Sequence, residues 1–349
     1  MKRVGLNFVL AGLLVCPTTV GGVKAATNTA PAFEEVIGLV REHLAGSNEK
    51  EINRAAVQGL ISQLYPRVSI VTNTTKPVAE TKPVGKTSLF DGPIGYVRIA
   101  RVSDGLAKDI RDAHHELNTT NKLTGLVFDL RFANGDDYGA AAEVADLFCA
   151  KERPLLDFGK GMNRSKSKSD ALKIPVAVLV NHQTASAAEA LASVLREIGA
   201  GLIIGTNTAG QAALMKNYDL TNGGQLRIAT SMIKLGDGTA VSMRGVKPDI
   251  EVAVAAADEK AYLADPFADL QASTEFPTSS LSSTNSANTN RVRRRISEAN
   301  LVRARRDGAS VDELPEREEP EKLEVRDVAL ARALDVLKGL AVVKQFRPN

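Results

Sequence analysis

Ser186 is the residue of this sequence whose position best suits nucleophilic chemistry. It follows an apolar run, 174–180, and a polar turn, 181–184, and it precedes a helical pattern that reaches about Ile198. Free backbone N–H groups and the positive dipole at a helix N-terminus can stabilise an oxyanion beside such a hydroxyl. The alternative is that Ser186 only caps the helix or packs as a small residue.

Two buried strands are expected to position this serine. The runs 174–180 and 201–205 are almost entirely apolar, and the helical pattern separates them. Apolar strands that alternate with helices predict an α/β fold whose parallel sheet is covered on both faces. In such sheets the functional site lies outside the carboxyl ends of the strands, which is where Ser186 is located.

Four sequence blocks occur in an order that is specific for a family. They are 125–131 ending in Asp-Leu-Arg, 178–189 with Val-Leu-Val-Asn-x-x-Thr-Ala-Ser-Ala-x-Glu, 204–210 with Ile-Gly-Thr-x-Thr-x-Gly, and 245–250 with Gly-Val-Lys-Pro-Asp-Ile. Together they resemble the carboxy-terminal processing peptidases, also called tail-specific proteases. The resemblance covers residues 92–254 and implies the spiral α/β core shared with Clp proteases and crotonases.

The resemblance implies a serine nucleophile and a lysine general base, and one of the two is replaced here. The nucleophile position is Ser186, whereas the lysine position, directly after a Thr-Ala-Gly run, is Gln211. A serine hydroxyl is a weak nucleophile until a neighbouring base accepts its proton. A glutamine amide has no such proton-accepting function near neutral pH.

The resemblance also assigns roles to the neighbours of these two positions. The backbone N–H groups of Gly135 and Ala187 would hold the oxyanion, and Glu189, one turn into the helix, would orient its neighbours. Asp136 occupies the place of the family's second glycine, where its charge would oppose a developing negative charge in a dry site. His182 has the chemistry of a substitute base, and the alternative is a strand-end histidine with no role.

Changes in composition along the chain predict six regions. A charged start, an apolar stretch and the pattern Val23-Lys24-Ala25 predict a secretory signal peptide, and therefore a periplasmic or extracellular protein. The regions are a signal peptide at 1–25, a helical pre-domain at 33–65, a linker at 66–91, a protease-like core at 92–266, a Ser/Thr/Asn-rich linker at 267–290 and a charged helical C-terminal region at 291–349. The linker at 66–91 is too short for the PDZ domain that many members of this family carry there.

The overall composition is that of a globular protein and favours no cofactor. The absence of tryptophan, 4% aromatic residues and a net charge of +3 argue against a nucleic-acid partner. The four histidines and the cysteine outside the signal peptide show no metal-ligand spacing. No stretch after the signal peptide is apolar enough to span a membrane. The amphipathic pattern from 328 to about 343 predicts a helix that docks on the core or mediates self-association.

Two hypotheses for function follow from these observations. In the first, the protein is a serine-type peptidase with impaired or absent catalysis that acts on peptides or on the C-termini of unfolded proteins. In the second, it is a non-catalytic relative that binds peptide, or an envelope-assembly partner, in the same groove. A third interpretation, a crotonase-like acyl-transfer enzyme, has only the fold in its favour. The sequence assigns no role to the arginine-rich segment 291–306.

Overall fold

A six-stranded sheet organises the larger of two units in the computed structural model, which describes residues 30–46, 48–71, 82–268 and 325–346. The units divide after Gln63. The strand order is β14-β10-β9-β5-β3-β2, and all neighbours are parallel except β2 and β3. The bounds are β2 Val84–Phe90, β3 Ile94–Ile99, β5 Gly125–Asp129, β9 Val176–Val180, β10 Gly201–Gly205 and β14 Ile250–Glu251. The predicted mixed α/β fold is therefore confirmed.

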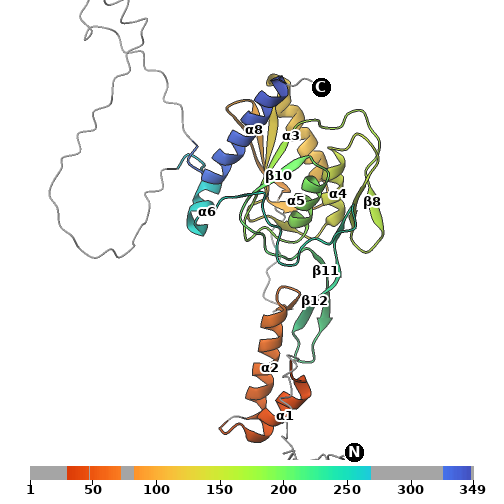
Figure 1. Cartoon of the computed structure of the whole chain (residues 1–349), viewed down its shortest axis with the longest axis vertical. Coiled ribbons are helices and arrows are strands. Elements are labelled where there is room, and N and C mark those ends of the chain that lie inside the picture. The colour runs from red at the N-terminus through yellow and green to blue at the C-terminus, as the bar shows by residue number, and fades with distance from the viewer. Residues whose placement is uncertain (1–29, 47, 72–81, 269–324, 347–349) are drawn as a thin grey trace, which may run out of the picture. The chain divides into compact units, whose positions relative to one another are not determined.

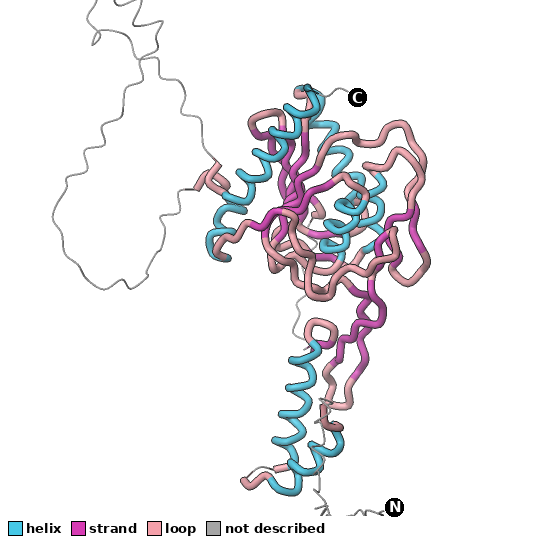
Figure 2. The backbone as a smooth tube through the Cα atoms, in the orientation of Figure 1, coloured by secondary structure: helices cyan, strands magenta, loops and turns pink. Residues whose placement is uncertain are grey.

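Helices cover both faces of this sheet (Figures 1 and 2). Because successive strand residues point to opposite faces, each buried strand supplies two sets of apolar side chains. One set, including Phe128 and Val178, packs in the core formed with α3 (Leu106–Thr120), α4 (Tyr138–Asp146) and α5 (Ala187–Glu197). The other set, including Val127 and Leu179, packs against α8 (Val328–Phe346).

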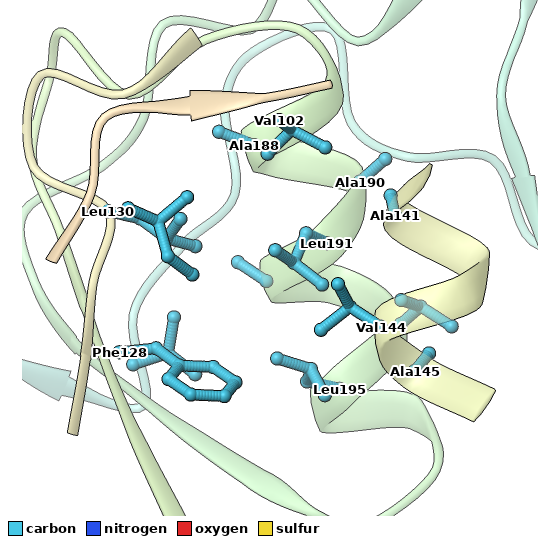
Figure 3. Close-up of a cluster of buried hydrophobic side chains, with 14 of the residues drawn as sticks. Val102, Phe128, Leu130, Ala141, Val144, Ala145, Ala188, Ala190, Leu191 and Leu195 are labelled. Atoms are coloured by element: carbon cyan, nitrogen blue, oxygen red, sulfur yellow. The ribbon is translucent and has the colours of Figure 1, made fainter. Parts of the chain in front are cut away.

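Small residues allow α4 and α5 to pack closely against each other (Figure 3). Ala141 and Ala145 of α4 and Ala188 and Ala190 of α5 are all buried, and larger side chains such as Leu191 fill the space toward the sheet. Close packing leaves few voids, so the start of α5 is held firmly against the ends of the strands. This packing fixes the backbone that precedes and includes Ser186.

The helix α8 is fastened to the sheet by an ion-pair cluster as well as by apolar contacts. Nη2 of Arg131 lies 2.6 Å from Oδ2 of Asp129 and 2.7 Å from Oδ2 of Asp327. Oδ1 of Asp327 also accepts hydrogen bonds from the backbone N–H groups of Ala329 and Leu330, which caps the helix. The structure shows this helix docked on the core, which is one of the two roles that the sequence left open for it.

The described residues also form three smaller sheets. They are β1-β12-β11, β13-β7-β8 and β4-β6. Their bounds are β1 Val68–Val71, β4 Arg101–Val102, β6 Asn134–Gly135, β7 Pro154–Asp157, β8 Met162–Arg164, β11 Ala213–Asp219, β12 Gln225–Met232 and β13 Lys234–Leu235. The helix α6, Ala256–Ala264, follows β14.

The expectation of a linker over 66–91 was wrong in part, because β1 and β2 lie in it. β2 is an edge strand whose side chains are mostly partly or fully exposed, so it lacks the apolar pattern by which a buried strand is recognised. β1 has only four residues and pairs with β12, about 160 residues further along the chain. The residues next to β1 in the sequence therefore do not predict that it forms a strand.

The smaller unit contains the two helices that the apolar spacing in 33–65 predicts. They are α1, Phe33–His43, and α2, Glu49–Leu64, whose last residue belongs to the larger unit. Oδ1 of Asn48 accepts from the N–H of Glu51 at 2.9 Å, and Oε2 of Glu51 accepts from the N–H of Asn48, so the two residues cap α2 reciprocally.

The predicted signal peptide at 1–25, most of the linker at 267–290 and the arginine-rich segment 291–306 lie outside the described residues. Within the described residues, no helix combines the length and the apolar character that crossing a membrane requires.

Candidate active site

Ser186 occupies a strained turn between β9 and α5. Its backbone has φ 55° and ψ −121°, a conformation that residues with a Cβ rarely adopt. Such strain costs on the order of 1–3 kcal/mol and persists only where the surrounding structure enforces it. A strained serine at the carboxyl end of a buried strand presents its hydroxyl to the space above the sheet, as a nucleophile requires.

Buried polar side chains hold this turn in place. Oδ1 of Asn181 accepts hydrogen bonds from the N–H groups of Phe132, Gln183 and Thr184, each at 3.1 Å. The hydroxyl of Thr184 donates to the carbonyl of Leu130 at 2.8 Å. The turn before Ser186 is thereby joined to the loop after β5, which carries the expected oxyanion residue Gly135.

Glu189 joins the serine turn to the loop that carries the base position. Its fully buried carboxylate accepts from the N–H of Ser186 at 2.9 Å, the hydroxyl of Thr208 at 2.5 Å, the N–H of Gly210 at 2.7 Å and the N–H of Gln211 at 2.6 Å. Burial raises the pKa of Glu189, and these hydrogen bonds counteract the rise. The carboxylate therefore acts as a clamp between two segments.

Gln211 lies next to Ser186, as the family pattern implies for the base position. The Ser186 hydroxyl donates to the backbone carbonyl of Gln211 at 3.4 Å, and the side-chain amide of Gln211 donates from Nε2 to the Tyr65 hydroxyl at 3.2 Å. An amide nitrogen is a donor with no proton-accepting capacity at neutral pH. The Gln211 side chain therefore cannot accept a proton from the Ser186 hydroxyl.

The two residues expected to form the oxyanion hole flank the serine on different segments. Ala187 is the first residue of α5, and the N–H groups of a first helical turn have no partner within the helix. Gly135 lines the same cleft as Ser186 with φ +141°, and a Cβ built on it would lie 2.1 Å from the carbonyl oxygen of Val102. Only glycine fits at that place.

Asp136 lies in a different environment from the one the sequence suggested. The expectation was a charge in a dry site, but 78% of its side chain is exposed and its Oδ1 pairs with Nη2 of Arg101 at 3.0 Å. Water and a paired cation both reduce its influence on the oxyanion position. His182, the suggested substitute base, is exposed and lines the cleft with Ser186.

Tyr138, the first residue of α4, is a site residue that sequence reasoning missed. Its phenol donates to the carbonyl of Ala213 at 3.0 Å and lies within hydrogen-bonding reach of the Ser186 side chain. Burial, and to a smaller extent the charge of Glu189, raises the pKa of Tyr138 to about 12. The phenol therefore stays protonated at neutral pH and does not serve as a base. Nothing in the sequence at the start of this helix indicated that Tyr138 would lie close to Ser186.

An open cleft of about 560 Å³ surrounds the serine. None of the described residues that line it is a lysine, and several come from segments remote in sequence. The lining residues are Tyr65, Arg101, Asn134, Gly135, Asp136, His182, Gln183, Ala185, Ser186, Ala209, Gln211 and Arg227. Among the residues that the structure describes, no group of three or more His, Cys, Asp or Glu side chains is arranged to hold a metal ion.

Comparisons with known proteins match most of the residues around this cleft to one family. Residues 93–252 match the sequence model of peptidase family S41. A carboxy-terminal-processing protease of Bartonella bacilliformis is 31% identical over 46% of this chain and 39% of its own length, and the carboxy-terminal processing protease CtpA of Bacillus subtilis is 26% identical over 62% and 45%. The solved photosystem II D1 C-terminal processing protease is 27% identical over 53% of this chain and 48% of its own, with a TM-score of 0.39. The matched part spans less than half the length of these relatives.

Proposed function

Since residues 93–252 form a domain of peptidase family S41, we propose that this chain binds polypeptide in the cleft beside Ser186 and has lost most or all of its peptidase activity. The observation that carries the proposal is that the side chain at position 211 is an amide, which cannot accept a proton. By the sequence resemblance, Gln211 stands where the family has its general base. Its backbone carbonyl contacts the Ser186 hydroxyl, and its side-chain amide donates to Tyr65 instead of accepting a proton.

The size of the expected loss supports a binding function. Removing one member of a nucleophile–base unit can lower turnover by on the order of 10⁶-fold. A clamped serine turn, a loop that keeps Gly135 and an open cleft would nevertheless retain the shape that receives an extended peptide. Binding does not need the proton transfer that Gln211 prevents.

The rival function is a peptidase with a substitute base, and the presence of His182 in the same cleft favours it. Histidine suits general-base catalysis, and a water molecule could connect it to the serine. Against this rival, no hydrogen bond joins His182 to Ser186, both of which the structure describes, and the His182 side chain is exposed. A histidine-dependent peptidase would lose activity on His182→Ala.

Several finer assignments belong to the same proposal. The curated relatives are named for carboxy-terminal processing, so we infer that the polypeptides bound here include C-terminal segments of unfolded proteins. Export through the signal peptide at 1–25, a core of the ClpP and crotonase type, and the lack of a PDZ domain between 66 and 91 rest on the sequence resemblance. Self-association through the C-terminal helix also remains a prediction.

The test of binding is fluorescence anisotropy with a set of labelled extended peptides and the purified chain. We expect saturable binding that Ser186→Ala preserves and that Gln183→Trp, which fills the cleft from an exposed lining position, weakens at least tenfold. Gln58→Trp, the same change at an exposed position of α2, should leave binding unchanged. Absence of binding, or equal weakening by both tryptophan variants, would contradict a cleft-bound peptide.

A further inference from the structure

The cleft beside Ser186 carries an excess of positive charge. Its charged lining residues are Arg101, Arg227 and Asp136, and His182 adds a fourth titratable group. Arg101 and Asp136 pair with each other at 3.0 Å, so their charges largely cancel. Arg227 forms no ion pair with any residue that the structure describes, so its charge is available to a ligand in the cleft.

The three-stranded sheet β1-β12-β11 holds Arg227 near the serine. Arg227 lies on the central strand β12, opposite Ser69 of β1 and Asn217 of β11. Its guanidinium acts electrostatically on Tyr138, whose phenol reaches the Ser186 side chain. The side chain is half-buried, and partial burial strengthens its attraction for an opposite charge relative to a fully solvated arginine.

Two further features make this end of the cleft attractive to an anion. The N-terminus of α5 begins directly after Ser186 and contributes a positive partial charge. The buried carboxylate of Glu189, the nearest compensating charge, is engaged by four donors of the protein. Asp136 is the carboxylate among the described residues that line the cleft, and it is bound to Arg101. Glu189 does not line the cleft, but it keeps its negative charge, and its effect on Tyr138 is larger than that of Arg227.

We infer that the cleft selects polypeptide segments that carry an Asp or Glu side chain close to the peptide bond beside Ser186, and that Arg227 binds this carboxylate. The inference rests on the proposed function, because Arg227 can select an acidic side chain only if the cleft binds polypeptide. A guanidinium binds a carboxylate through two parallel hydrogen bonds, a geometry that neither an amide nor a lysine reproduces.

Three labelled peptides of equal length test this selectivity in a Ser186→Ala background, where cleavage cannot interfere. One carries a central glutamate and an amidated C-terminus, the second has glutamine in its place, and the third is the glutamine peptide with a free C-terminal carboxylate. We expect the glutamate peptide to bind at least tenfold more tightly than both others, with an advantage that falls as salt is raised from about 50 to about 200 mM.

The same peptides are then measured with variants of Arg227. Arg227→Gln should remove the glutamate preference while the glutamine peptide still binds, and Arg227→Lys should keep part of the preference. Arg111→Gln, at an exposed position of α3, removes the same charge and should change nothing. Urea unfolding midpoints verify that each variant is folded.

Three outcomes would overturn the inference, and they differ in what they say of the proposed function. Equal binding of all three peptides, or a glutamate preference that survives in Arg227→Gln, leaves peptide binding standing and removes Arg227 from it. A preference for the free C-terminus alone would assign the site to a chain end. Failure of every peptide to bind would overturn the proposed function as well.

Discussion

The carboxylate of Glu189 accepts a hydrogen bond from the backbone N–H of Ser186 at 2.9 Å. The same carboxylate binds the N–H of Gln211 at 2.6 Å, so one buried side chain fixes both the nucleophile position and the base position. The relative position of Ser186 and Gln211 is therefore set by a clamp that does not depend on the side chain of residue 211. A change of the side chain at position 211 can therefore alter catalysis without altering the geometry of the site.

Glu189→Gln should destabilise the domain by about 2–4 kcal/mol, because the amide nitrogen of glutamine cannot accept from the N–H groups that the carboxylate now binds. Urea unfolding measures this change. The matched control is Glu143→Gln, at an exposed position of α4, which should shift the free energy of unfolding by less than about 0.5 kcal/mol. Equal stabilities for the two variants would mean that Glu189 is not the clamp described above.

Gly135→Ala tests whether the glycine loop is held by close backbone approach. The new Cβ would lie 2.1 Å from the carbonyl oxygen of Val102 in addition to the strain of φ +141°. Gly161→Ala is the control, because Gly161 has φ +92° and no atom within 4 Å of the place that its new methyl group would occupy. We expect losses of about 3 kcal/mol or more for Gly135→Ala and about 1 kcal/mol for Gly161→Ala in urea unfolding. Similar losses would show that the loop yields to the methyl group.

Asp327→Asn tests the attachment of α8 to the sheet. Asparagine retains the oxygen that caps the helix but removes the charge that Arg131 binds at 2.7 Å. Because Asp129 still pairs with Arg131, the loss is that of one hydrogen bond between charged groups, about 1.5–3 kcal/mol. We expect a loss in this range together with faster hydrogen exchange of α8 amides. Asp335→Asn, at an exposed position of the same helix, should leave both measurements unchanged. Slow exchange in Asp327→Asn would show that apolar packing alone holds α8.

Much of the core could be predicted because its signals are local. The runs that became β9 and β10 are almost entirely apolar, and the pattern between them has the helical period of α5. Since both strands are parallel, their carboxyl ends had to meet, which placed Ser186 and the loop of Gln211 on the same side of the sheet. That these two residues lie close together therefore followed from the order of the elements.

The parts that could not be predicted depend on contacts between remote segments. The pair Arg131–Asp327 spans 196 residues. Tyr65 enters the cleft from a segment before the core, and Arg227 enters it from β12 within the core. Asp136 was expected in a dry site because its partner Arg101, 35 residues earlier, could not be identified from spacing. Side-chain direction and exposure at such positions are set by tertiary packing, which leaves no periodic trace in the sequence.

Peptide hydrolysis by the parent chain, Gln211→Lys and the double variant Gln211→Lys/Ser186→Ala tests the central claim most directly. The clamp is in place, Gly135 keeps its conformation and Asp136 pairs with Arg101, so under the proposed function the lack of a base at position 211 is the principal defect. We predict no serine-dependent cleavage by the parent, measurable cleavage by Gln211→Lys, and none by the double variant. Cleavage by the parent chain that Ser186→Ala abolishes would contradict the account and establish a working peptidase with another base.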